Sequence, residues 1–199
     1  MNKLKLKEVK WDGNASNPQY QLQYANSGNL LKTRAISQSI RSRLFGDFPL
    51  LIEVDSSLFT ADLGPGLALA KTFQKFLGEQ QIEFRHRNEI GPASVNFLSL
   101  VTRKSTEQHW IATVVSARQW QNTDFQATLP TSGIRFYGFK DGGIPPNLLD
   151  ELFAAKLSAA ELLKLSTIML FDVADYGQMG ISSLKLSQAE IQALLDQVP

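Results

Sequence analysis

The sequence of 199 residues contains no cysteine and only two histidines. Without cysteine there is no disulfide framework, no thiolate metal site and no cysteine nucleophile. Two histidines give no support to a histidine metal site or to a Ser-His-Asp triad. Apolar runs also fall far short of the roughly 20 residues that span a bilayer, and residues 1–7 alternate charge with leucine. We therefore expect a cytoplasmic protein without a membrane segment or signal peptide.

An excess of charge of one sign is absent, because 20 Lys and Arg against 19 Asp and Glu give a formal net charge of only +1. Residues 1–110 carry 14 Lys and Arg against 10 Asp and Glu, and residues 111–199 carry 6 against 9. Neither part has the basic density of a dedicated nucleic-acid binder, so nucleic acid is the less favoured partner. The apolar fraction of 43% is that of an ordinary globular chain.

The first half of the chain alternates strand and helix patterns. Residues 4–7 and 19–24 alternate with period two and predict a hairpin, and residues 30–36 predict a third strand before a short helix that opens at Ser37. Residues 50–55 are apolar at first and predict a buried central strand. A helix over 67–78 and a strand over 82–86 follow. Strand, helix and strand in this order predict a parallel βαβ unit.

The second half is predicted to become helical. Residues 95–102 and 110–117 predict a β-hairpin, and residues 134–139 a last strand. From Pro145 onward, two Ser-x-x-Glu capping boxes begin at Ser158 and Ser187 and predict two helix starts. The fold class is therefore α/β, with α+β as the alternative: a single domain with a mixed sheet over 1–144 and a helical C-terminal subregion over 145–199.

The loop after the central strand is the first candidate site, because ligands of open α/β sheets bind at the carboxyl ends of strands. Its oxygen ligands suit Mg²⁺ or Ca²⁺, and its glycines open backbone amides at a helix start. The same residue types also serve turns and helix caps, so both interpretations stay open. The candidates are Glu53, Asp55, Ser56, Ser57, Asp62, Gly64 and Gly66.

Two further surfaces are candidates. Four arginines form a possible basic face for phosphate or an acidic partner, with solvated surface charge as the alternative: Arg41, Arg43, Arg85 and Arg87. Apolar residues cover more of the predicted helix at 162–171 than a one-sided surface helix requires. That helix and the last one are candidates for an interface with another protein or a second copy, through Leu163, Met169, Phe171, Ile191, Leu194 and Leu195.

Residues 36–101 resemble a STAS or STAS-like domain, the fold of anti-sigma-factor antagonists and related regulatory modules. The resemblance rests on the strand Leu51–Asp55, the stretch Ala61–Leu69 and the helix that leads to Ile82. It implies a regulatory module that works through protein contacts. Members of that family carry a phosphorylatable serine at the strand-to-helix turn, and the matching position here is Leu63.

Two functions follow as hypotheses. The first is a non-catalytic binding or regulatory protein that acts through protein–protein contacts and needs no cofactor. The second is a metal-dependent hydrolase or nuclease that uses Mg²⁺ or Ca²⁺ at Glu53, Asp55 and Asp62.

Overall fold

The computed structural model describes most of the chain. The described residues are 4–10, 18–24, 30–55, 65–90, 94–96, 101–103, 106–122, 125, 132–140, 143–154, 156–173 and 177–197. No helix among these residues is long and apolar enough to cross a membrane.

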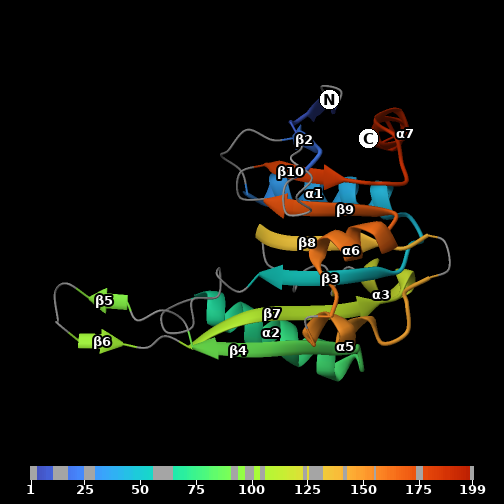
Figure 1. Cartoon of the computed structure of the whole chain (residues 1–199). Coiled ribbons are helices and arrows are strands. Elements are labelled where there is room, and N and C mark those ends of the chain that lie inside the picture. The colour runs from blue at the N-terminus through green and yellow to red at the C-terminus, as the bar shows by residue number, and fades with distance from the viewer. Residues whose placement is uncertain are drawn as a thin grey trace.

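One eight-stranded sheet organises the molecule, in the order β1-β2-β10-β9-β8-β3-β7-β4 (Figure 1). Its strands are β1 (Leu6–Glu8), β2 (Tyr20–Gln23), β3 (Leu50–Asp55), β4 (Phe84–Ile90), β7 (Thr106–Val115), β8 (Ser132–Gly138), β9 (Ile168–Val173) and β10 (Gln178–Ser182). A separate pair, β5 (Ser94–Asn96) and β6 (Val101–Arg103), lies beyond the ends of β4 and β7 in Figure 1.

Helices lie on both faces of the sheet (Figure 1). We call the face that carries α5 (Leu148–Phe153) and α6 (Ala159–Leu165) the front face. The opposite, back face carries α1 (Leu30–Phe45) and α2 (Pro65–Glu79). Two further helices complete the described fold. α3 (Ala117–Trp120) directly follows β7, and α7 (Gln188–Leu195) contacts α1 near the β1 end of the sheet.

The α/β class is confirmed, but the sheet is antiparallel at every described pairing instead of mixed. The predicted unit β3-α2-β4 is present in altered form. β7 lies between β3 and β4 and pairs antiparallel with both, so the two strands are parallel without being neighbours. The local pattern of strand, helix and strand cannot reveal a later strand that inserts between them.

Residues 30–36 are the first two turns of α1, not a third strand. The buried side of this helix is formed at helical spacing by Thr33, Ser37, Ile40 and Leu44, all at most 5% exposed. Because two of the four are small polar residues, the apolar period of the helix is hidden at its N-terminal end.

The predicted hairpin between residues 95–102 and 110–117 is also wrong. β5 pairs with β6, while β7 pairs with β4 through most of its length. The turn residues near 104 separate β6 from β7 along the chain and do not join two paired strands.

The C-terminal part is not purely helical, because β9 and β10 enter the interior of the sheet. α6 ends at Leu165, and residues 168–171 form a strand instead of continuing the helix. Ile168, Met169 and Leu170 are at most 2% exposed, with alternate residues buried on opposite faces. A strand covered on both sides has a continuous apolar run, which resembles a fully buried helix segment in the sequence.

The outer edge of β1 is closed by one side chain of α7. The Gln192 amide accepts a hydrogen bond from the Leu6 N–H at 3.0 Å and donates one to the Leu4 carbonyl at 2.7 Å. These two bonds take the place of a neighbouring strand at one N–H and one C=O group of an exposed sheet edge. They hold β1 in place beside the surface described next.

Candidate binding surface on the front face

The antiparallel register aligns one residue from each of six neighbouring strands in a row across the front face. From the β1 edge inward the row runs Lys7, Gln21, Gly180, Phe171, Arg135 and Glu53. Alternate residues of the same strands face the back and are mostly apolar. The front face is thus where this sheet places its polar and charged side chains.

At the inner end of the row lies a buried charge pair. Glu53 is 3% exposed, and its Oε1 lies 3.6 Å from Nη1 of Arg135, directly opposite on β8. The Tyr137 hydroxyl also hydrogen-bonds with the Glu53 carboxylate. A buried carboxylate is costly unless a cation and hydrogen bonds compensate it, and here both are present.

This environment shifts the pKa of the Tyr137 hydroxyl. Burial raises the pKa of the Tyr137 hydroxyl far above its ordinary value, and the neighbouring negative charge of Glu53 raises it further. The phenol is therefore held as a neutral hydrogen-bond donor.

Phe171 connects this buried pair to the open part of the face. The Arg135 guanidinium carbon lies 5.1 Å from the centroid of the Phe171 ring, within the range of a cation–π contact. Phe171 is half-buried, and beyond it none of the described helices lies over the front of β10, β2 and β1 (Figure 1).

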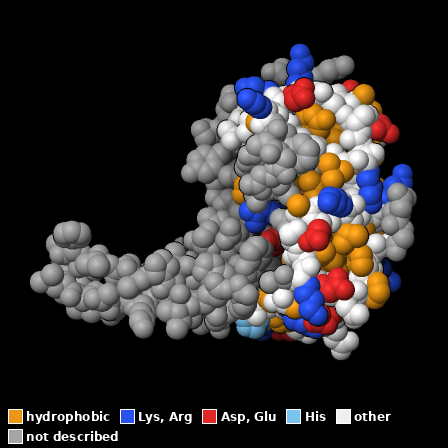
Figure 2. Space-filling view, viewed as in Figure 1, with side chains coloured by type: hydrophobic (Ala, Val, Ile, Leu, Met, Phe, Trp, Pro, Cys, Tyr) orange, Lys and Arg blue, Asp and Glu red, His pale blue; other side chains and the backbone are white. Residues whose placement is uncertain are grey.

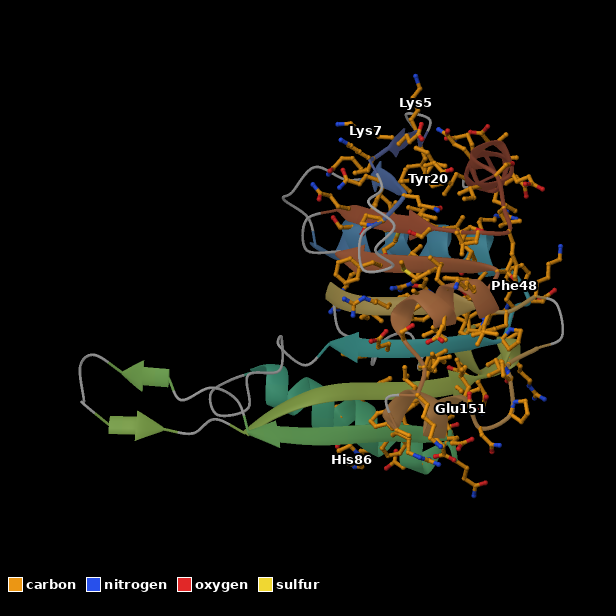
Figure 3. All side chains as sticks on the ribbon, viewed as in Figure 1. Lys5, Lys7, Tyr20, Phe48, His86 and Glu151 are labelled. Atoms are coloured by element: carbon orange, nitrogen blue, oxygen red, sulfur yellow. The ribbon has the colours of Figure 1, made fainter. Side chains whose placement is uncertain are left out.

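A hollow of about 570 Å³ lies over this open part. Among the described residues, its polar lining consists of two lysines from the β1 segment and three glutamines from β2 and β10, all exposed. Figure 3 shows both lysines at the β1 end of the sheet, and Figure 2 shows blue side chains at the same end. These polar residues are Lys5, Lys7, Gln21, Gln23 and Gln178.

Gly180 shapes the floor of the hollow. A Cβ at this position would lie 2.7 Å from the Cβ of Pro18, so only glycine lets Pro18 lie against the sheet there. Pro18, Gly180 and Phe171 give the hollow an apolar floor. An apolar floor with polar groups around it is the usual construction of a binding surface.

The arrangement suits binding of a negatively charged group. Two ammonium groups attract carboxylates or phosphates, and glutamine amides offer both donors and acceptors. No carboxylate lines this hollow among the described residues.

The structure describes only part of the predicted carboxylate site. Glu53 is held by Arg135 and Tyr137, as described above, and Gly66 lies in the first turn of α2. Asp55 ends β3, but its side chain lies outside the described residues, as do Ser56, Ser57, Asp62 and Gly64. Within the described part of the chain, no group of three or more His, Asp or Glu side chains is placed to hold a metal ion. The hydrolase hypothesis stays a prediction.

Of the four arginines of the predicted basic face, Arg41 and Arg43 on α1 lie on the opposite face of the sheet from Arg85. Arg41 is 9% exposed and lies over the Phe136 ring on the back face, and Arg43 is exposed on the same helix. Arg85 lies on the front, where its Nη2 is 3.0 Å from Asp150 of α5. The Arg87 side chain is not among those described.

Most of the apolar residues proposed for a partner interface are buried by the chain itself, while Phe171 and Leu194 are half-buried. Leu163 and Met169 belong to the core between the sheet and α5–α6, and Phe171 packs against it. Ile191 and Leu195 are at most 1% exposed in the core of the back face, and Leu194 packs against that core. Their burial is therefore explained by the fold of one chain.

Sequence reasoning missed the residues that make this surface. The alternation of Lys5 and Lys7 with leucine predicts a strand and places both lysines on one face, but it does not show that this face borders a hollow. Arg135 and Tyr137 give no local signal, because their role depends on pairing with a strand about 80 residues earlier.

Comparison with protein-family models, with curated proteins and with solved structures finds no match for this chain. The resemblance to STAS domains therefore stays a prediction.

Proposed function

We propose that this protein is a non-catalytic binding protein that holds an acidic partner protein against the open half of its front face. The observation that carries the proposal is the hollow over β1, β2 and β10, with two exposed lysines, no described carboxylate and an apolar floor that includes Phe171. Complementary charge steers such partners together and selects among them. A cysteine-free chain needs no oxidising compartment, and the proposal includes a cytoplasmic location.

A protein partner fits this surface better than a nucleic acid does. Among the described residues two cations line the hollow, whereas nucleic-acid sites combine many phosphate contacts along a basic stripe. Glutamine amides pair equally well with peptide backbone and with acidic side chains.

The test is affinity capture from the native host with three baits: the wild type, Lys5→Glu/Lys7→Glu, and Arg34→Glu/Lys75→Glu. The two variants change the net charge equally, but the control replaces exposed residues of α1 and α2 on the back-face helices. We expect a protein that is retained by the wild type and the control and lost by Lys5→Glu/Lys7→Glu. Identical captured sets for all three folded baits, or no retained protein, would overturn the proposal.

A further inference from the structure

Lys5 and Lys7 form a pair with the spacing of an extended chain. Both are exposed, while Leu6 between them packs toward the back-face core. Residues two apart on a strand share one face and lie about 7 Å apart. Two ammonium groups thus stand at one edge of the hollow at the repeat of a β-strand.

Glutamines continue the surface on the neighbouring strands. Gln21 lies opposite Lys7 on β2, and Gln178 of β10 lies beside Gln23 of β2. Their amides suit a partner whose backbone N–H and C=O groups are available. An extended segment has such groups, whereas a helix satisfies them within itself.

We infer that the acidic partner, on the basis of the proposed function, binds through an extended segment in which acidic residues alternate with other residues. Its acidic side chains point toward Lys5 and Lys7 with the same two-residue repeat. Its backbone lies over Gln21 and Gln178, and a side chain from the partner contacts the half-buried Phe171 ring on the floor of the hollow.

The experiment uses two synthetic peptides of equal composition and charge. In one, Glu and Thr alternate; in the other, they follow the order Glu-Glu-Thr-Thr, which places no two glutamates at the two-residue repeat. Binding to the full chain at low salt is measured by calorimetry, with Lys5→Glu/Lys7→Glu and the control Arg34→Glu/Lys75→Glu beside the wild type. A single-stranded oligothymidylate is the third ligand.

We expect the alternating peptide to bind the wild type and the control about tenfold more tightly than the other peptide, and Lys5→Glu/Lys7→Glu to lose this preference. If the wild type binds both peptides equally and Lys5→Glu/Lys7→Glu binds neither, the inference of an extended segment is overturned. The proposal of an acidic partner then remains. Binding of neither peptide would also overturn the extended segment, while the capture experiment decides the proposed function. Tighter binding of oligothymidylate than of either peptide would overturn both.

Discussion

The two faces of the sheet differ in what they bury. On β3, Leu50, Ile52 and Val54 are fully buried in the apolar core of the back face. The alternate residues of the same strand face the front, where Leu51 is followed by the charged Glu53. Because the side-chain period of a strand is two, one strand contributes to both environments. The larger apolar core therefore lies on the back, and the charge pair of Glu53 and Arg135 lies on the front.

The two halves of the front face differ in what covers them. Its inner half is covered by α5 and α6, and there the charge of Glu53 is compensated within the chain. Its outer half over β1, β2 and β10 presents lysines and glutamines to the surroundings. Substitutions on the two faces and in the two halves should therefore affect different measurements.

The largest difference is expected between two phenylalanines. Phe136 is 2% exposed on the back face, and its ring centroid lies 6.0 Å from that of Phe45. Phe136→Ala should lower the free energy of unfolding by about 3–5 kcal/mol. Phe171→Ala, at a half-buried front position, should cost about 1–2 kcal/mol in denaturant titrations. Equal losses would contradict the division between the faces.

Removing Arg135 should lower the stability of the fold, because the buried Glu53 carboxylate loses its cation. Arg135→Met leaves Glu53 without its cation, and we expect a loss of about 3 kcal/mol in the free energy of unfolding. The double variant Glu53→Gln/Arg135→Met has no buried charge at this position and should regain part of that loss in the same titration. A double variant less stable than Arg135→Met would show that the pair does not determine the effect.

Alanine substitutions at two glycines test how closely each face of the sheet is packed. A Cβ at Gly138 would lie 2.7 Å from Cδ1 of the buried Phe45 ring, so Gly138→Ala should destabilise by about 1–3 kcal/mol. Gly180→Ala meets Pro18, which is half-buried, and should destabilise less while weakening binding of the alternating acidic peptide. Thermal unfolding and calorimetry separate the two effects. Unchanged peptide binding in Gly180→Ala would count against the role of Pro18 in the hollow.

The smallest expected effect concerns Tyr137 and depends on pH. Tyr137→Phe removes the hydrogen bond to Glu53 and should cost about 1.5 kcal/mol near neutral pH. The pKa of Tyr137 is raised in the folded state, so its contribution is present below the unfolded value of about 10 and lost as pH rises above it. The variant should therefore lose stability less steeply above pH 10 than the wild type or the control Tyr20→Phe. Parallel curves for all three would contradict the assignment.

Several elements could be predicted because their signals are local. The pairing of β1 with β2, the buried strand β3 and helix α2 follow from alternation, an apolar run and helical spacing. Both capping boxes are formed, with the Ser158 and Ser187 hydroxyls accepting from the amides of Glu161 and Glu190 at 3.3 Å. These contacts span three residues, so the sequence contains all that they need.

The alternating segments, the starts of these two helices and the lack of thiol chemistry can all be inferred from the amino-acid sequence alone. Two features depend on long-range pairing: β7 lies between β3 and β4, and residues 168–171 form a strand. Only the tertiary structure decides that Glu53 meets Arg135 and that Lys7 meets Gln21 beside an open hollow. The reason is physical: strand pairing joins residues distant in the chain, and the register that aligns them depends on burial of the whole sheet.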